Sequence, residues 1–345
     1  MFSSLLRVAE GDESLNENST PYRVGLVGAG GVSEMHLAGM MRHANRMKVV
    51  ALCDPDQDRR TSRSAAYGIP ETFAELDAFI RETDMDAAIV CTPTHVRTQV
   101  LFPLIEAGIP VLCEKPLAET YAEAAAIEAK AREHGVAVAV NQNFRRFFSF
   151  STARRILAED RLGRPLHLTQ IANSLRRDQG WRLQRTRYVM AVMSVHWFDG
   201  YRYLLDDEAE TVYCRAVDSP ATPGRPETAV SVIIQFRKRA VASLTESFSS
   251  YAGHAFASLD CEAGGLILDY GSLVEVRESG KRIEHVNPFD KPEATYLLLE
   301  DLVRAVAARR EPATSASDNL KTMRIVEAAY ESLEQDKVVR VEDVS

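Results

Sequence analysis

The feature that constrains this chain most is a short apolar run that leads into a cluster of glycines. Residues 22–30, YRVGLVGAG, predict a buried strand followed by a tight turn, and the segment from Ser33, SEMHLAGMMRH, has the pattern of a helix. Further apolar runs, separated by helical patterns, lie at 47–54, 86–93, 109–116 and 136–143. Near-continuous apolar strands that alternate with helices predict a parallel sheet covered on both faces. Such a sheet binds ligands outside the carboxyl ends of its strands.

The second half of the chain shows a different pattern. Short runs joined by turns, several of which alternate apolar and polar residues, lie at 165–173, 210–218, 228–237, 240–249, 256–264, 265–271 and 272–278. They predict an antiparallel sheet with one solvated or interface face. Helical patterns at 293–310 and 317–334 close the chain. We therefore predict an α/β protein with a poorly ordered tail at 1–20, a nucleotide-binding domain at 21–142, and an α+β domain at 143–345 whose last helices could pack back on the first domain.

Composition excludes several classes of protein. The formal net charge of −8 argues against nucleic acid as a partner, because phosphate binding needs a basic face. The five cysteines are widely spaced and include no C-x-x-C pair, which indicates reduced thiols in a cytoplasmic protein and no metal site. Residues 1–20 contain only a very short apolar patch, which indicates neither a signal peptide nor a membrane span. We therefore expect a cytoplasmic protein without a metal, a nucleic-acid partner or a membrane partner.

The glycine loop indicates a dinucleotide site. Residues 28–33 read G-A-G-G-V-S, close to the fingerprint G-x-G-x-x-G. Gly28 would allow the tight turn, Gly30 would let the backbone approach a pyrophosphate, and the following helix would offer its N-terminal amides. Asp54 ends the second strand, where a carboxylate would accept hydrogen bonds from a ribose 2′-hydroxyl and favour NAD. NADP is the alternative, because Arg59 or Arg60 could fold back onto a 2′-phosphate.

A second motif connects the chain with a known family. Residues 114–116 read Glu-Lys-Pro at the end of a predicted strand. Together with the glycine loop, "CDPD" at 53–56, "TP" at 92–93 and the late "YLLLEDLVRAVAARREP", this motif resembles the glucose–fructose oxidoreductase and inositol dehydrogenase family (Gfo/Idh/MocA) over nearly the whole chain. The resemblance implies a Rossmann domain followed by a domain with a large open sheet that often forms homodimer or homotetramer contacts. It also implies a nicotinamide cofactor and a sugar, polyol or related substrate.

Lys115 is the first candidate catalytic residue. A lysine at a strand's carboxyl end, held by the following proline, lies where ligands bind in such sheets, and its ammonium could stabilise a developing alkoxide. With the resemblance, the expected cofactor contacts are Gly28, Ala29, Gly30, Gly31, Val32, Asp54, Arg59, Cys91, Thr92, Pro93, His95, Glu114, Lys115, Gln142, Trp181 and Arg182. The expected substrate contacts are Lys115, Asn143, Tyr188, His196 and Asp199.

His196, in the apolar stretch AVMSVHWFDG, is the second candidate catalytic residue. The family pattern D-x-G-x-H-x-x-D matches here at His196 and Asp199, but Val192 and Ser194 replace the first aspartate and the glycine. A carboxylate four residues before the histidine would lie on the same helix face and could orient the imidazole. Three alternatives follow: His196 remains the general acid and base, Tyr188 or Arg185 handles the proton, or the chain binds cofactor and sugar without turnover.

The function that these residues favour is hydride transfer. We expect an NAD(P)-dependent oxidoreductase acting on a secondary alcohol or carbonyl of a sugar, polyol or derivative, with His196 exchanging the hydroxyl proton and Lys115 stabilising the oxyanion. Two alternatives stay open. One is a lyase or hydrolase that uses tightly held NAD for transient oxidation. The other is a non-catalytic regulatory protein that binds NAD and a sugar.

Overall fold

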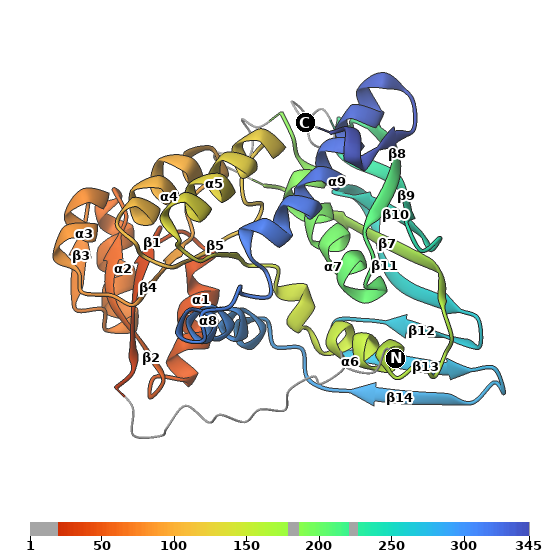
Figure 1. Cartoon of the computed structure of the whole chain (residues 1–345), viewed down its shortest axis with the longest axis horizontal. Helices are drawn as coiled ribbons and strands as arrows, with labels where there is room; N and C mark the ends of the chain where they lie inside the picture. Colours follow the sequence, from red (N-terminus) through yellow and green to blue (C-terminus); the bar gives the residue numbers. More distant parts are fainter. Residues whose placement is uncertain (1–19, 179–185, 221–226, 345) are drawn as a thin grey trace.

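The first half of the chain forms a parallel sheet that carries helices on both faces (Figure 1). The structure is a computed structural model that describes residues 20–178, 186–220 and 227–344. The strands lie in the order β3-β2-β1-β4-β5-β6, and every neighbouring pair is parallel. Their bounds are β1 Tyr22–Val27, β2 Met47–Cys53, β3 Glu71–Phe73, β4 Ala87–Val90, β5 Val111–Cys113 and β6 Val138–Val140. The parallel sheet predicted from the apolar runs is confirmed.

Each face of this sheet packs against its own group of helices. Val24 and Leu26 of β1 face α1 and the late helix α8 (Lys291–Ala307), whereas Val27 and Val90 face the core shared with α3, α4 and α5. Burial on both faces is the reason that the strands read as continuous apolar runs. The helices of this half are α1 Ser33–Arg42, α2 Gln57–Tyr67, α3 Leu76–Glu82, the 3₁₀ turn η1 Thr94–Val96, α4 Arg97–Glu106 and α5 Tyr121–His134.

The ends of α5 show how local sequence sets a helix. The Thr120 side chain accepts a hydrogen bond from the backbone N–H of Glu123, whose carboxylate reaches back to the backbone of Thr120. This capping box satisfies amides that the first turn leaves without partners. At the other end Gly135 adopts φ 65°, a left-handed conformation that glycine accepts without strain. Residues of the local sequence therefore set both ends of α5, Thr120 and Glu123 at the start and Gly135 at the end.

The second half builds a nine-stranded sheet within the described residues, in the order β14-β13-β12-β11-β7-β10-β9-β8-β15. Its neighbouring strands pair antiparallel except for β7 and β10, which are parallel. The expected mostly antiparallel sheet is confirmed, with β14 and β15 as strands that the sequence pattern had not indicated. The bounds are β7 Pro165–Leu175, β8 Ala209–Val217, β9 Ala229–Phe236, β10 Val241–Ser247, β11 Ser249–Cys261, β12 Gly264–Leu268, β13 Ser272–Arg277, β14 Arg282–Val286 and β15 Val339–Arg340.

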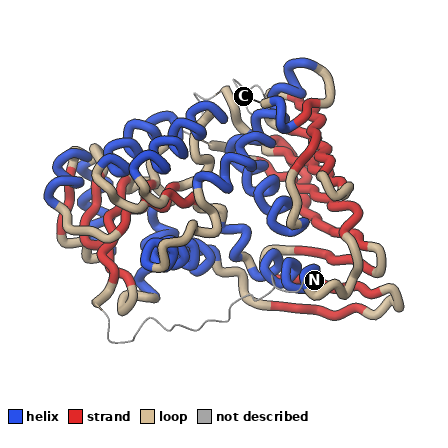
Figure 2. The backbone as a smooth tube through the Cα atoms, in the orientation of Figure 1, coloured by secondary structure: helices blue, strands red, loops and turns tan. Residues whose placement is uncertain are grey.

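One face of the large sheet is covered by helices and the other is open (Figure 2). Ile233, Tyr251 and Phe256 are exposed on strands of this sheet, as expected for a solvated or interface face. The covering elements are η2 Asn143–Arg146, α6 Phe148–Ala158, the π-helical turn η4 Met190–Ser194, α7 Val195–Leu205, α9 Ala316–Gln335 and η5 Val341–Asp343. Among the helices in the described ranges, none combines the length and the hydrophobicity that crossing a membrane requires.

Helix α8 (Lys291–Ala307) returns to the first sheet and packs against α1. Gly39 of α1 makes this approach possible, because a Cβ at this position would lie 2.5 Å from the carbonyl oxygen of Pro292. The stacked rings of His43 and Tyr296, with centroids 3.8 Å apart, extend the same contact. The packing of α1 against α8 therefore depends on a missing side chain as well as on apolar burial.

This contact predicts that Gly39→Ala destabilises the fold by about 1–3 kcal/mol, since the carbonyl of Pro292 belongs to the backbone and cannot rotate away. Urea denaturation followed by circular dichroism would measure the change. Gly253→Ala is the matched control, because the nearest atom to its added Cβ lies 3.7 Å away. Equal stabilities of the two variants would contradict the role assigned to Gly39.

Candidate functional site

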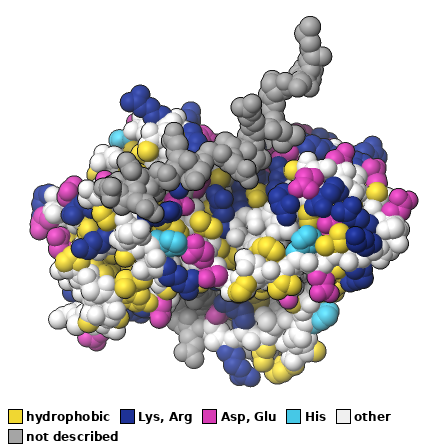
Figure 3. Space-filling model, turned by 90° about the horizontal axis from the view of Figure 1, so that it is seen from below, with side chains coloured by type: hydrophobic (Ala, Val, Ile, Leu, Met, Phe, Trp, Pro, Cys, Tyr) yellow, Lys and Arg dark blue, Asp and Glu magenta, His cyan; other side chains and the backbone are white. Residues whose placement is uncertain are grey.

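A cavity of about 1040 Å³ lies at the carboxyl ends of β1, β4 and β5. Both halves of the chain line it, since Gly30 belongs to the loop after β1 and His196 belongs to α7. This is the place where an open parallel sheet binds its ligands. The face in Figure 3 carries Lys and Arg side chains interspersed with Asp and Glu.

Most of the predicted site residues line this cavity, namely Gly28, Gly30, Gly31, Val32, Asp54, Arg59, Cys91, Thr92, Pro93, His95, Glu114, Lys115, Asn143, Tyr188 and His196. Three others, Ala29, Gln142 and Asp199, lie in the described part of the chain but outside the lining. Trp181 and Arg182, together with Arg185 as an alternative proton handler, lie outside the described residues. The cavity thus brings together residues that lie far apart in the sequence.

The glycine loop has the shape that a dinucleotide needs. Gly28 adopts φ 97°, and a Cβ there would lie 2.9 Å from the carbonyl carbon of Cys91, so only glycine fits. At Gly30 and Gly31 a Cβ would meet no described atom within 4 Å, so the loop faces open space. The N-terminus of α1 follows directly and directs its first amides to this region.

Asp54 is held at the end of β2 by backbone amides. Its carboxylate accepts hydrogen bonds from the N–H groups of Ala29, at 2.7 Å, and Asp56, at 2.9 Å. Ala29 therefore does not line the cavity, but its backbone N–H holds the carboxylate of Asp54. Arg60 donates to the carbonyl oxygen of Asp54 at 2.5 Å, and the Arg59 Nε lies 3.1 Å from the carboxylate of Asp56. Both arginines thus already have partners around a carboxylate that lines the cavity.

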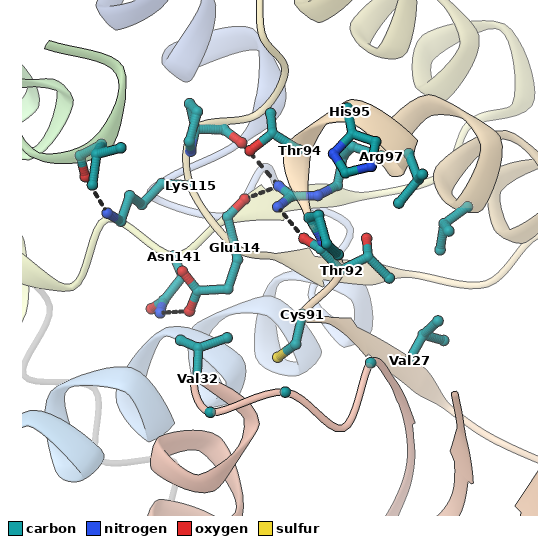
Figure 4. A pocket seen from close by; sticks show the side chains of 18 of the residues that line it. Val27, Val32, Cys91, Thr92, Thr94, His95, Arg97, Glu114, Lys115 and Asn141 are labelled. Atoms are coloured by element: carbon teal, nitrogen blue, oxygen red, sulfur yellow. Dashed lines mark hydrogen bonds between the residues drawn. The ribbon is translucent and has the colours of Figure 1, made fainter. Parts of the chain in front are cut away.

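Glu114 is a buried charge that links three segments. Its carboxylate contacts the Nε2 of His36 at 2.8 Å. It also accepts a hydrogen bond from the Asn141 amide at 2.6 Å (Figure 4). Burial alone would raise the pKa of Glu114, but His36, Lys115 and Asn141 together lower it to about 2. The carboxylate therefore stays ionised. It joins α1, the end of β5 and the end of β6.

His36 and Arg97 are residues that the sequence reasoning missed. Burial lowers the pKa of His36, but the neighbouring Cys91 and Glu114 outweigh it and raise the pKa to about 10. Arg97 is buried and donates to the carbonyl oxygens of Thr92, Glu114 and Pro116, which clamps the two loops of the cavity together. Two features of the sequence could have indicated them. His36 lies in the first turns of the helix that follows the glycine loop, and Arg97 begins α4 shortly after the Thr92–Pro93 loop.

The imidazole of His196 is buried, stacked and hydrogen-bonded. Its Nδ1 lies 2.9 Å from the Oε1 of Gln142, and its ring stacks on Phe144 with centroids 4.4 Å apart. Burial, together with the positive charges of Lys115 and Lys291, keeps the pKa of His196 well below 6.5. The ring is therefore neutral at neutral pH. With Nδ1–H donated to the Gln142 carbonyl, Nε2 keeps its lone pair.

This geometry differs from the expected one at two residues. We expected Gln142 to face the nicotinamide or substrate, but it lies behind His196 and takes the orienting position that Val192 cannot fill. We expected Asp199 to contact the substrate or orient His196, but it is fully buried in ion pairs with Arg145, at 2.7 Å, and Arg202, at 3.7 Å. Buried charges need such partners, so Asp199 anchors α7 instead.

Lys115 reaches across the cavity to the segment that carries His196. Its Nζ donates a hydrogen bond to the carbonyl oxygen of Val192 at 2.5 Å (Figure 4). Val192 lies in the π-helical turn Met190–Ser194, which replaces the regular helix that the sequence pattern predicted at this point. Such turns interrupt helices and often occur at functional sites.

Two further candidates are held at the edge of the cavity. The hydroxyl of Tyr188 donates to Asp178 at 2.7 Å, so it already has a carboxylate partner. The Asn143 amide donates to Thr295 at 3.1 Å, while its Oδ1 is buried without a hydrogen-bond partner in the described part of the chain. An unpartnered acceptor in the cavity lining is available to a bound ligand.

Comparison with known proteins agrees with this architecture. The family model described as "Oxidoreductase family, NAD-binding Rossmann fold" matches residues 22–142, and the model for the GFO/IDH/MocA C-terminal domain matches residues 150–267. A 1,5-anhydro-D-fructose reductase of Ensifer adhaerens is 30% identical over 66% of this chain and 70% of its own length. A D-apiose dehydrogenase of Paraburkholderia graminis is 24% identical over 94% of this chain and 90% of its own.

The fold is also shared with solved structures. An oxidoreductase from Agrobacterium radiobacter, in complex with NAD+, L-tartaric acid and magnesium, has a TM-score of 0.87 at 19% identity and covers 94% of this chain and 99% of its own. The resemblance drawn from the glycine loop and the Glu-Lys-Pro motif is therefore confirmed. The chain belongs to the Gfo/Idh/MocA family of oxidoreductases, with an NAD-binding Rossmann domain at its N-terminal side.

Proposed function

We propose that this protein transfers a hydride between a nicotinamide cofactor and a secondary alcohol or carbonyl of a sugar, polyol or derivative. The observation that carries the proposal is that Lys115 and His196 line the same cavity as the glycine loop. Family membership supports the reaction class. Relatives named as a reductase of 1,5-anhydro-D-fructose and a dehydrogenase of D-apiose support the substrate class.

The residues of the chain divide the proton chemistry between them. NAD, when bound, accepts or returns the hydride. The Lys115 ammonium hydrogen-bonds the reacting oxygen and stabilises its negative charge. The Nε2 of His196 takes the hydroxyl proton during oxidation and returns it during reduction. Gln142 and Phe144 hold the ring from its other sides, and the burial of His196 keeps water away from it.

We propose NAD as the preferred cofactor. Asp54 lines the cavity after β2, where a carboxylate would contact the adenosine ribose and its charge would repel a 2′-phosphate. Arg59 and Arg60, the residues that could have bound such a phosphate, pair with Asp56 and with the backbone of Asp54. The loop after β2 therefore favours a 2′-hydroxyl over a 2′-phosphate.

We further propose a cytoplasmic homodimer or homotetramer that assembles through the open face of the large sheet. Ile233 and Phe256 are exposed there, at 51% and 39%. Large apolar side chains gathered on one sheet face are typical of protein interfaces. The reduced state of the five buried cysteines suits the cytoplasm.

The role of Lys115 predicts that Lys115→Ala lowers kcat by about 10²–10³-fold while the Kd for NADH changes little. Steady-state assays over a sugar and polyol panel, read at the absorbance of reduced nicotinamide, would measure kcat, and NADH fluorescence would measure binding. Lys130→Ala, a surface lysine paired with Glu106, is the control. Unchanged turnover in Lys115→Ala would refute the role. Product formation without any net absorbance change would instead favour the lyase alternative.

The role of Gln142 predicts that Gln142→Leu lowers kcat by about tenfold, because the imidazole loses the acceptor that sets its orientation and tautomer. The Kd for NADH should stay the same, since Gln142 does not belong to the cavity lining. Gln170→Leu is a matched control, because Gln170 is also buried but its amide bonds to the backbone of Ile171. Equal kcat values for the two variants would remove Gln142 from the mechanism.

The role of Asp54 predicts that Asp54→Asn lowers the preference for NADH over NADPH by about tenfold, since the repelling charge disappears while one of the two oxygens that accept backbone N–H groups remains. Fluorescence titrations with both cofactors would give the ratio of Kd values. Asp58→Asn, an exposed position in the first turn of α2, is the control. A ratio that stays at the wild-type value would exclude Asp54 as the discriminating residue.

A further inference from the structure

Glu246 is a buried carboxyl group that the proposed mechanism does not use. It lies on β10 and is 1% exposed. Its inward-facing neighbours on the strand, Ala242 and Leu244, are apolar, so Glu246 interrupts an otherwise apolar face. Burying a carboxyl group is costly, and a well-packed apolar side chain would serve stability at least as well. The position therefore calls for a role other than packing.

The contacts of Glu246 lead directly to the segment around His196. The Ser194 hydroxyl donates to Oε2 at 2.5 Å, and the Trp197 indole N–H donates to Oε1 at 3.2 Å. These two donors flank His196 in the sequence, one at the end of the π-helical turn and one in the first turn of α7. Glu246 thus holds the backbone that carries the imidazole.

Lys115, in the loop after β5, contacts the same π-helical turn. The Lys115 Nζ binds the carbonyl oxygen of Val192, two residues before Ser194. Burial raises the pKa of Glu246 to about 7, against the lowering effects of Ser194, Trp197, Lys115 and Arg176. In the described part of the chain, Tyr201 and Tyr270 also face Glu246; burial raises the pKa values of both tyrosines and Glu246 raises them further. Lys115 and Glu246 therefore contact the same turn, and the charge of Lys115 lowers the pKa of Glu246.

The two departures from the family pattern meet at this point. Val192 stands where the pattern has an aspartate, and Ser194 stands where it has a glycine. Glycine has no hydroxyl to donate, so the bond to Glu246 exists only because of the second departure. The turn therefore lacks a carboxylate at position 192 and has, at position 194, a hydroxyl that donates to the carboxylate of Glu246.

We propose that Glu246 is a positioning residue that supplies, from β10, the carboxylate that the chain lacks at position 192. It holds the π-helical turn through Ser194 and, when ionised, stabilises the charged form of Lys115. This rests on the proposed function of Lys115 and extends it, because it adds to the neighbouring carboxylate of Glu114 a second counter-charge for the lysine, which comes from a strand of the second sheet. An ionised carboxylate favours a nearby ammonium, so its removal makes Lys115 lose its proton at lower pH.

The test is Glu246→Gln, which removes the charge and keeps the size of the side chain. The amide oxygen can still accept from the Trp197 indole, and the amide nitrogen can donate to the Ser194 hydroxyl. The first readout is independent of turnover: the rate at which acetic anhydride acylates Lys115, followed by mass spectrometry across pH. Its midpoint should move down by about one pH unit. The second readout is kcat against pH, which should fall by about tenfold near neutrality with the Kd for NADH unchanged.

A rescue and two further variants make the result specific. Adding Val192→Asp to Glu246→Gln restores a carboxylate to the turn and should recover most of the midpoint shift and part of kcat. Ser194→Ala, which removes the hydroxyl donor but keeps Glu246, should shift both readouts in the same direction by less. Glu275→Gln removes an equally buried glutamate on β13 that pairs with Arg277 at 2.9 Å, and should leave the acylation midpoint unchanged.

An unshifted acylation midpoint in folded Glu246→Gln, or a double variant without rescue, would overturn the proposal. If Glu246→Gln does not fold, Ser194→Ala decides: a wild-type midpoint and kcat in that variant would refute the link through the turn. Failure of the proposed hydride transfer would show itself differently, as wild-type protein that binds NADH but turns over no compound of the panel. The acylation midpoints would still test Glu246 in that case.

Discussion

The buried carboxylate of Glu114 is the interaction on which the arrangement of the cavity depends. It binds His36 of α1 and Asn141 after β6, while its own backbone precedes Lys115. A carboxylate in the interior must keep such partners, because losing one would leave a charge without compensation. The glycine-loop helix, the lysine loop and the end of β6 are consequently fixed to one another, and Arg97 binds the same loop from its other side through backbone carbonyls.

A network of buried ion pairs positions α7, which carries His196 on the other side of the cavity. Asp199 of α7 pairs with Arg145, which also contacts Asp318 of α9 at 2.5 Å, and Arg202 joins the same carboxylates. These charges lie between helices that cover the large sheet. They fix α7 so that His196 faces the first domain while Gln142 reaches it from the end of β6. The two halves of the cavity are therefore joined by polar bonds of defined geometry as well as by apolar packing.

Much of the fold followed from periodicity. Continuous apolar runs between helical patterns predicted the parallel sheet, and the glycines and Asp54 predicted the loop that faces the cavity. The short β14 and β15 were missed because their side chains alternate weakly and tertiary pairing decides them. The π-helical turn could not be predicted, since its extra residue is stabilised by contacts from Lys115 and Glu246 that lie far away in the sequence.

The sequence by itself determined the fold class, the family, the glycine loop and the two polar candidates, Lys115 and His196, because these depend on local spacing and residue type. Only the tertiary structure decided the partners of those candidates. Gln142, and not Asp199, contacts the imidazole, and a glutamate from β10 reaches the turn where an aspartate was missing. The physical reason is that hydrogen bonds and buried charges act over a few ångströms in space, and strands and helices distant in the chain meet there only after folding.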